Sequence, residues 1–217
     1  PQLSALQQQA LTEVKIAFSQ RDTCLLHGVT SSGKTAVYIE LIKSALAEGK
    51  QVLYLLPEIA LTTQLMQRLG RVFGDKMGVY HSKFPDNERV ETWLRQLSSE
   101  PFPLILGVRS ALLLPFQNLG LIIVDEEHEA SYKQQDPAPR YHARDTALVL
   151  AQRCCAKVLL GTATPAVETY YNVQKGKFGV VEMHQRFGDL QMPQILVEDV
   201  GELRRKKLMK TPFAPRL

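Results

Sequence analysis

Cysteine is scarce in this 217-residue chain, and the three that occur, Cys24, Cys154 and Cys155, form no Cys-x-x-Cys pair. An odd count without metal-ligand spacing argues against a zinc site or a disulfide framework and favours a reducing compartment. The chain also lacks an apolar run long enough to cross a bilayer, and no signal peptide opens it. We therefore expect a cytoplasmic protein without a membrane-spanning segment.

Internal repeats and low-complexity tracts are also absent, and neither sign of charge dominates strongly. The chain has 26 Lys and Arg against 22 Asp and Glu, which gives a formal net charge of +4. A mildly basic balance is compatible with a polyanionic partner but does not require one. Because 45% of the residues are hydrophobic and 22% are charged, the composition is that of an ordinary globular domain with enough apolar material for a core.

Short apolar runs alternate with helical patterns along most of the chain. The runs are rich in Val, Ile and Leu with little polar alternation, which is typical of parallel strands buried on both faces. The alternation predicts an α/β fold with a mostly parallel, doubly wound sheet and helices on both faces. Ligands in such folds bind outside the carboxyl ends of the strands. The expected strands are Thr23–His27, Val52–Leu56, Leu104–Val108, Leu121–Val124, Val158–Leu160 and Ile195–Val197, and the expected helices are Lys34–Glu48, Leu61–Phe73, Asn87–Ser98, Arg144–Cys154 and Ala166–Val173.

The two ends of the sequence bear on its domain organisation. The chain begins at Pro1 instead of a methionine, and the basic run Arg204–Lys207 lies close to its last residue. We expect a single domain over residues 1–217 that belongs to a longer protein, with an irregular C-terminal extension from about residue 177 to 217. We interpret the basic run as a solvated face and not as a nucleic-acid contact.

A phosphate-binding motif follows the first expected strand. Gly28–Thr35 reads Gly-Val-Thr-Ser-Ser-Gly-Lys-Thr, which is the complete pattern Gly-x-x-x-x-Gly-Lys-[Ser/Thr] in its required strand-to-helix context. The two glycines permit a tight turn, and the amides that follow can point at phosphate oxygens in front of the helix N-terminus. Lys34 can reach the β- and γ-phosphates, and the Thr35 hydroxyl can bind Mg²⁺.

An acidic motif follows the expected strand Leu121–Val124, in the order Asp-Glu-Glu-His. A carboxylate at the end of a strand beside a phosphate loop is placed to hold Mg²⁺ through water, and we assign this role to Asp125. A second carboxylate one residue later can orient and deprotonate an attacking water, and we assign this role to Glu126.

The other residues of the acidic motif have several possible roles. His128 either senses the γ-phosphate or contacts the turn at Gly161–Pro165. Glu127 and Glu129 are interpreted as solvated or structural. Acidic residues after a strand also cap helices, so the motif gains its catalytic interpretation from the phosphate loop beside it.

Five segments together carry a family resemblance. Gly28–Thr35, Asp125–His128 and Gly161–Pro165 resemble motifs I, II and III of superfamily 2 helicases. Leu55–Thr62 and Asp125–Asp145 narrow the resemblance to the bacterial replication-restart helicases, and the likeness covers nearly the whole chain. It implies a RecA-like first motor lobe that uses ATP and Mg²⁺ for 3′-to-5′ DNA unwinding in replication restart and primosome assembly.

The resemblance also implies the residues of the nucleotide site. Gln7, placed ahead of the first helix, resembles the glutamine that reads adenine, and Gln8 and Gln9 are alternatives in the same register. Catalysis is expected from Lys34, Asp125 and Glu126, and the metal ligands are expected to be Thr35 and Asp125. The expected ATP-binding residues are Gln7, Gly28, Val29, Thr30, Ser31, Ser32, Gly33, Lys34 and Thr35.

Three further segments resemble DNA-contacting parts of such helicases. Pro57–Gln64 and Gly107–Ser110 resemble motifs that grip the single-strand backbone, where hydroxyls and an arginine fork suit phosphates. Ala130–His142 resembles a mobile, aromatic-rich loop that links DNA contact to hydrolysis. This loop has no tryptophan, which leaves Tyr141 as the expected stacking residue. The expected DNA-contact residues are Thr62, Thr63, Arg109, Ser110, Tyr132, Lys133, Arg140, Tyr141 and His142, and the expected coupling residues are His128, Thr162 and Thr164.

Helicases of this kind carry parts that the sequence does not show, namely an N-terminal DNA-binding region, a zinc-binding region and a second RecA-like lobe with an arginine finger. Because such a finger contributes about 10³–10⁵ in rate, we expect the chain alone to be nearly inactive.

The expected partners are single-stranded or forked DNA, other primosome proteins, single-strand DNA-binding protein and the second lobe. An RNA helicase lobe, a P-loop kinase and a nucleotide-gated binding module are the alternatives.

Overall fold

The computed structural model describes residues 3–29, 32–60, 63–81, 84–183, 197–209 and 211. The chain divides into two compact units, Pro1–Phe187 and Gly188–Leu217. The second unit contains the short helix α7 (Val200–Arg205), whose N-terminus is capped by the Asp199 side chain. None of the helices in the described residues combines the length and the apolar character needed to span a bilayer.

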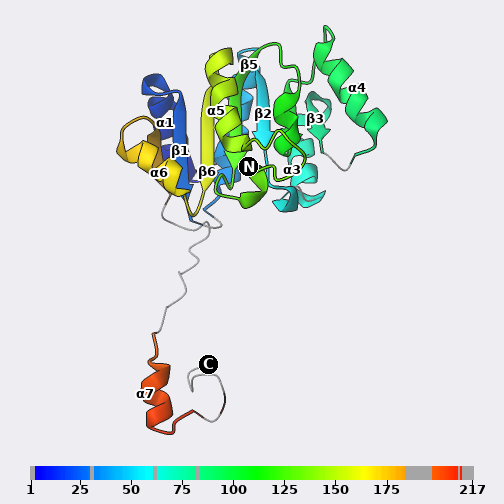
Figure 1. Ribbon diagram of the computed structural model, residues 1–217. Coiled ribbons are helices and arrows are strands. Elements are labelled where there is room, and N and C mark those ends of the chain that lie inside the picture. Colours follow the sequence, from blue (N-terminus) through cyan, green and yellow to red (C-terminus); the bar gives the residue numbers. More distant parts are fainter. Residues whose placement is uncertain are drawn as a thin grey trace. The chain divides into compact units, whose positions relative to one another are not determined.

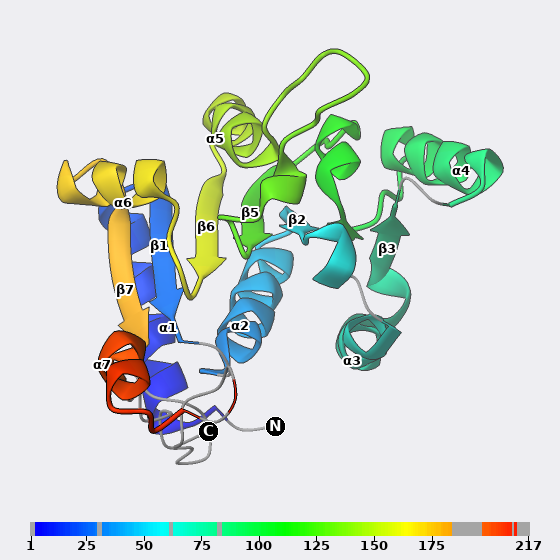
Figure 2. The same ribbon diagram turned by 60° about the horizontal axis from the view of Figure 1, so that its bottom comes forward.

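The first unit is built on one seven-stranded sheet of described residues in which every pairing is parallel. The strand order is β3-β4-β2-β5-β6-β1-β7, and Figure 2 shows β7, β1, β6, β5 and β2 side by side in this order. The strands are β1 Thr23–Gly28, β2 Gln51–Leu55, β3 Met77–Tyr80, β4 Leu104–Gly107, β5 Leu119–Asp125, β6 Lys157–Thr162 and β7 Gly179–Met183.

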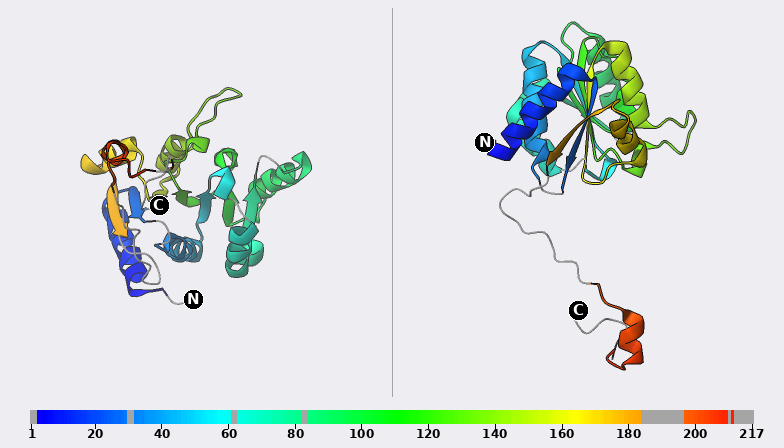
Figure 3. Two further views of the ribbon diagram at one scale, coloured as in Figure 1. Left: turned by 90° about the horizontal axis from the view of Figure 1, so that it is seen from below. Right: turned by 90° about the vertical axis from the view of Figure 1, so that its left-hand side faces the viewer.

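Helices cover both faces of this sheet (Figures 1 and 3). Buried side chains of α1, α2 and α3 belong to the hydrophobic cluster on one face, and those of α5 belong to the cluster on the other face. The helices are α1 Ala5–Gln20, α2 Lys34–Ala47, α3 Thr63–Phe73, α4 Asp86–Leu97, α5 Ala143–Cys154 and α6 Val167–Gln174, and short 3-10 turns span Glu58–Ala60, Gly74–Lys76, Arg109–Leu113 and Ala130–Tyr132.

Three neighbouring strands in the middle of the sheet carry the motifs that the sequence analysis singled out. The phosphate loop follows β1, the acidic motif follows β5, and the turn at residues 161–165 begins at the end of β6. The register pairs Asp125 with Gly161 and His27 with Thr162, so the three carboxyl ends lie side by side. The fold therefore brings the motifs to one edge of the sheet, as parallel topology requires.

The predicted fold class is confirmed, with a sheet that is wholly parallel where we expected a mostly parallel one. Five expected strands and all five expected helices are present, with ends shifted by at most two residues. The expected strand Ile195–Val197 lies outside the described residues except for Val197, which is in no strand. Within the extension expected from about residue 177, Gly179–Met183 forms the edge strand β7 of the sheet.

Helix α1 and strands β3 and β7 were not predicted. β3 has four residues, and β7 lies at the sheet edge with an alternating burial pattern, so neither forms a long apolar run. α1 had a usable signal, because Ser4 and Gln7 form a capping box and Ala10, Leu11 and Val14 supply a buried face. Gln7 therefore lies inside the first helix and not ahead of it.

We expect Ile123→Ala, a cavity-forming change in β5, to lower the free energy of unfolding by about 2–5 kcal/mol. Ile123 is fully buried two residues before Asp125, whereas Val167 is 82% exposed at the start of α6. The control Val167→Ala should change stability by about 0.5 kcal/mol or less. Urea unfolding followed by circular dichroism measures both, and equal losses in the two variants would contradict this packing.

Candidate functional site

The turn between β1 and α2 is closed by glycines. Gly33 precedes α2 with φ 86°, a left-handed conformation that favours glycine. A Cβ on Gly28 would come within 2.7 Å of the Ser32 hydroxyl and 3.2 Å of Lys34 Cγ. The loop can therefore fold this tightly with glycine at both positions. Thr30 and Ser31, two expected phosphate-binding residues, lie outside the described residues.

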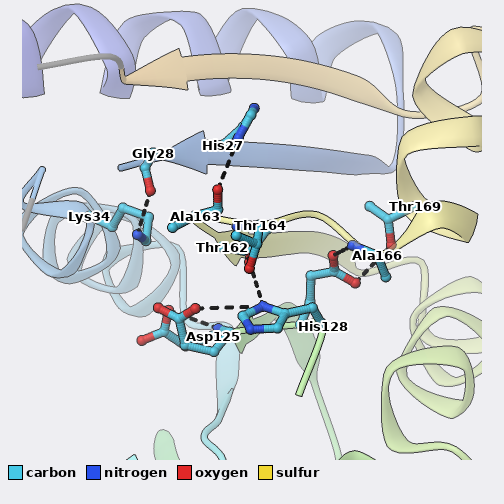
Figure 4. Close-up of polar contacts among 12 residues, drawn as sticks. His27, Gly28, Lys34, Asp125, His128, Thr162, Ala163, Thr164, Ala166 and Thr169 are labelled. Carbon is cyan, nitrogen blue, oxygen red and sulfur yellow. Dashed lines mark hydrogen bonds and ion pairs between the residues drawn. The ribbon is translucent and has the colours of Figure 1, made fainter. Parts of the chain in front are cut away.

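Hydrogen-bond donors line this turn, and one of them, the Ser32 hydroxyl, has no partner in the described structure. This hydroxyl is buried, and no described side chain caps the N-terminus of α2. Lys34 is 8% exposed, and its ammonium donates to the Gly28 carbonyl at 2.8 Å (Figure 4). A buried hydroxyl without an acceptor, beside an ammonium and a helix N-terminus, fits the oxygens of a bound phosphate.

Asp125 is held by two tyrosines that sequence reasoning missed. The Tyr38 hydroxyl of α2 donates to Asp125 Oδ1 at 2.9 Å, and the Tyr54 hydroxyl of β2 donates to Oδ2 at 3.1 Å. The Glu126 amide also donates to Oδ1, at 3.1 Å. Each carboxylate oxygen thus has a donor, which sets the plane of the carboxylate at the end of β5.

Burial controls the protonation of this cluster. Desolvation raises the pKa of Asp125 above its ordinary value, although the Tyr38 hydrogen bond and the Lys34 charge act in the opposite direction. Burial and then the Asp125 charge raise the pKa of Tyr38 and Tyr54 well above the ordinary value, so both hydroxyls keep their protons at neutral pH. The tyrosines therefore act as permanent donors to the carboxylate.

Glu126 and His128 lie beside the end of β6. His128 Nδ1 is 2.6 Å from the Thr162 hydroxyl oxygen and 3.7 Å from Glu126 Oε2 (Figure 4). The Thr164 amide donates to the same Thr162 oxygen at 3.0 Å. Of the two roles expected for His128, the geometry supports contact with the turn at residues 161–165.

Gln7 is the glutamine that lies against the phosphate loop. It is 5% exposed, and a Cβ on Gly33 would collide with its side-chain amide nitrogen. Its Oε1 accepts from the Ser4 amide at 2.9 Å as part of the capping box. Gln8 and Gln9 are exposed on α1. The structure therefore brings Gln7 to the site, and Gln8 and Gln9 point elsewhere.

The expected DNA-contact residues fall into different environments. Thr62 lies outside the described residues, and Thr63 is exposed at the first position of α3. Ser110 has a buried hydroxyl without a partner in the described structure. Arg109 donates to the Ser131 carbonyl at 2.7 Å and to the Lys133 carbonyl at 3.4 Å, so its guanidinium braces the 130–142 loop.

Tyr132 requires a correction. Its side chain is 1% exposed, and its hydroxyl donates to the Asp125 carbonyl at 2.6 Å. A ring buried in this way offers no face for a base to stack on. Tyr132 therefore supports the end of β5 in this structure and does not belong to the DNA-contact surface.

The 130–142 loop is internally hydrogen-bonded, although we expected a mobile loop. Lys133 pairs with His142 in an antiparallel bridge, and the Lys133 ammonium donates to the Arg140 carbonyl at 2.5 Å. Arg140 also pairs with Asp136 at 2.9 Å and remains exposed. Tyr141 is half-buried, with its hydroxyl 3.4 Å from the Arg109 carbonyl. Burial lowers the pKa of His142, so this side chain is neutral at pH 7 and adds no cation.

Comparisons with known proteins place this geometry in a family. Residues 4–173 match the family described as DEAD/DEAH box helicase. Replication restart protein PriA of Chlamydia trachomatis is 41% identical over 98% of this chain and 28% of its own length, and PriA of Haemophilus influenzae is 43% identical over 99% of this chain and 29% of its own. The chain thus spans less than a third of the length of these curated relatives.

Solved structures share the fold at low identity. RecG bound to a three-way DNA junction superposes with a TM-score of 0.62 at 18% identity, covering 88% of this chain and 25% of that one. The helicase MrfA bound to DNA and AMPPNP has a TM-score of 0.59 at 19% identity, covering 85% and 27%. The fold of a helicase lobe and the resemblance to replication-restart proteins are therefore confirmed.

Gly161 leaves the space that the Tyr38 hydroxyl fills, since a Cβ there would collide with it. We expect Gly161→Ala to cost about 1–3 kcal/mol of unfolding free energy through overpacking. The double variant that carries Gly161→Ala and Tyr38→Phe should lose about 1 kcal/mol less unfolding free energy than the sum of the losses in the two single variants. Denaturant unfolding of the four proteins measures the cycle.

Gly70 in α3 provides the control for this cycle, because a Cβ there meets no atom within 4 Å. Gly70→Ala should leave stability unchanged or raise it by about 0.5–1 kcal/mol, the helical preference for alanine. Strictly additive losses for Gly161→Ala and Tyr38→Phe would show that the hydroxyl does not occupy the space beside Gly161.

Proposed function

This chain belongs to the DEAD/DEAH box helicase family and is a homologue of replication restart protein PriA, and from this we propose that it is the first RecA-like motor lobe of an ATP-dependent DNA helicase acting in replication restart. Unwinding from 3′ to 5′, and assembly with primosome and single-strand DNA-binding proteins, are proposed on the same family relationship. One observation supports the proposal most strongly: the phosphate loop, whose Ser32 hydroxyl is unpartnered among the described residues, and the Asp125 carboxylate held by two tyrosines lie at the carboxyl ends of β1 and β5, which flank β6.

The phosphate end of ATP fits the turn between β1 and α2. The Ser32 hydroxyl, the Lys34 ammonium and the N-terminus of α2 supply donors at this turn, and phosphate oxygens are the acceptors that suit them. Lys34 exchanges its bond with the Gly28 carbonyl for phosphate oxygens in this proposal. Gln7, against Gly33, is placed at the mouth of the same loop.

The oxygen donors of Thr35 and Asp125 suit Mg²⁺, which prefers carboxylate, hydroxyl and water oxygens. Mg²⁺ supplies neutralisation of the charge that develops on the phosphates. Tyr38 and Tyr54 hold Asp125 in one orientation for this purpose. Glu126 is partly exposed beside that carboxylate, and we assign to it the removal of a proton from the attacking water.

DNA contact is proposed for Thr63 at the start of α3 and for Arg140 in the 130–142 loop, which are both exposed. The Thr63 hydroxyl and the Arg140 guanidinium are suited to phosphates, whereas the Ser110 hydroxyl is buried and could contact DNA only after a local rearrangement. RecG bound to a three-way DNA junction and the helicase MrfA bound to DNA share this fold, which supports DNA over RNA. Arg109 braces the loop through Nη1, which donates to two of its carbonyls.

We expect Lys34→Ala in the full-length gene product to lower ATP turnover about 100-fold or more, the usual effect of removing one charge-stabilising donor. Single-strand DNA binding should stay within about twofold, since Lys34 lies in the phosphate turn. Phosphate release with matched DNA and RNA strands, and fluorescence anisotropy with labelled DNA, measure the two properties.

Lys43→Ala is the matched control, because Lys43 lies on the same helix and pairs with Glu40 at the surface. It should leave turnover unchanged. Equal loss of DNA binding and turnover in Lys34→Ala would contradict the role of Lys34 in phosphate binding. Stimulation of turnover by RNA but not by DNA would favour the RNA helicase alternative. The chain alone should show far slower turnover than the full-length product.

We expect Tyr141→Ala to weaken DNA-stimulated turnover more than ATP binding, because base stacking on an aromatic side chain contributes about 1–3 kcal/mol. Tyr141→Phe keeps the ring and loses a long hydrogen bond of 3.4 Å, so it should retain stimulation. Turnover against DNA concentration, with fluorescent-nucleotide binding, separates the effects. A parallel fall of basal and stimulated rates would mean that Tyr141 acts on the nucleotide site and not through DNA.

A further inference from the structure

Glu127 is the fully buried member of the acidic motif. Its side chain is 0% exposed, whereas that of Glu126 beside it is 37% exposed. Glu127 Oε2 accepts from Arg144 Nη1 at 3.1 Å and from the Thr169 hydroxyl at 2.8 Å, and Oε1 accepts from the Ala166 amide at 2.8 Å. These partners all lie outside the phosphate loop, and Glu127 takes no part in the chemistry proposed above.

The partners of Glu127 come from two segments that border the site. Arg144 is the second residue of α5, directly after the 130–142 loop. Ala166 is the N-cap of α6, and Thr169 lies in its first turn, so both follow the turn at residues 161–165 (Figure 4). The Glu127 amide also donates to the Gly161 carbonyl at 3.1 Å. Glu127 thus connects the acidic motif to the start of α5, which follows the 130–142 loop, and to the turn that contains Thr162.

The position of Arg144 is unfavourable without this partner. A cation in the first turn of a helix opposes the helix dipole, and a buried guanidinium costs desolvation free energy. Arg144 is 6% exposed and has carboxylates on three sides: Glu127, Asp145 at 2.9 Å and Glu168 at 3.8 Å. Glu127 is the buried one of these carboxylates, so the start of α5 depends on it most directly.

The backbone connects this pair to the proposed base. Glu126 has φ 48°, a left-handed conformation that non-glycine residues rarely adopt. The Glu126 amide is held by Asp125, and the Glu127 amide by Gly161. These bonds restrain the backbone that joins Glu126 to Glu127.

We propose that Glu127 and Arg144 form a positioning pair that transmits displacement of the 130–142 loop to Glu126 and to the Thr162 turn. The inference rests on the proposed function, since it requires turnover that depends on DNA. Neither residue contacts nucleotide or DNA. Movement of the loop shifts the first turn of α5, Arg144 carries the shift to Glu127, and Glu127 acts on its own turn and on the start of α6.

The test measures turnover of the full-length gene product with and without single-stranded DNA. Arg144→Lys keeps the charge but loses the planar fork that serves Glu127 and Asp145 together. We expect basal turnover, nucleotide affinity and DNA affinity within about twofold of the unmodified protein, and maximal DNA stimulation lower by about fivefold or more. The same change at Arg153, in the last turn of α5, is the matched control and should keep full stimulation.

Thr169→Val is the second variant, because Arg144→Lys disturbs a buried pair and its stability must be checked by thermal unfolding. Valine has the shape of threonine without the hydroxyl that donates to Glu127, so we expect a folded protein with stimulation reduced by about twofold or more. If Arg144→Lys fails to fold, the DNA stimulation of the Thr169→Val protein tests the role of the pair.

Where the unmodified protein is stimulated by DNA, two results would overturn the pairing role. Full stimulation in a folded Arg144→Lys protein, or in Thr169→Val where the first variant is unfolded, would show that the pair carries no signal. A parallel fall of basal and stimulated turnover would show a merely structural role. If the unmodified protein shows no DNA stimulation at all, the proposed function fails first and the pairing role fails with it.

Discussion

Two buried tyrosine hydroxyls hold the Asp125 carboxylate, and the arrangement of the whole site depends on this contact. Tyr38 stands on the phosphate-loop helix and Tyr54 on β2, so one carboxylate joins α2, β2 and β5. Gly161 on β6 leaves the room that the Tyr38 hydroxyl needs. Burying an ionisable group without hydrogen bonds is costly, and three donors offset that cost here. The orientation of Asp125 therefore follows from hydrogen bonding and packing within the protein itself.

A second constraint separates the acidic side chains that follow Asp125. The left-handed conformation of Glu126, with φ 48°, costs about 1–3 kcal/mol, and such strain persists where the surroundings hold it. Hydrogen bonds from the Glu126 amide to Asp125 and from the Glu129 amide to the Glu126 carbonyl hold it here. The turn leaves Glu126 partly exposed beside His128 and sends Glu127 into the core. Two identical side chains thus acquire opposite environments one residue apart.

Local patterns predicted the parts of this structure that are local in origin. The phosphate loop and the Asp125–Glu126 pair each lie within a few residues of one strand, so spacing alone located them. Tyr54 and Arg144 act through contacts with residues 71 and 17 positions away, and no periodicity reports such contacts. Periodicity also misleads in α4, where Val90, Trp93, Leu94 and Leu97 are spaced like a core face yet are 40–59% exposed. The helix instead buries Gln96, so its existence was predictable and its orientation was not.

The proposed coupling requires the 130–142 loop to be stiff, because a displacement of the loop has to reach α5. Its ends are joined by the Lys133–His142 bridge, and Arg109 ties its first half to the turn after β4. A loop held in this way moves as a unit, because displacing its tip must break these bonds or carry the first turn of α5 along. Coupling between sites requires an element with discrete positions that both sites can bias. A loop that absorbed the displacement in its own backbone could not bias the buried pair of Arg144 and Glu127. In the proposed coupling, the stiffness of the loop is what lets a displacement reach the start of α5, where Arg144 binds Glu127.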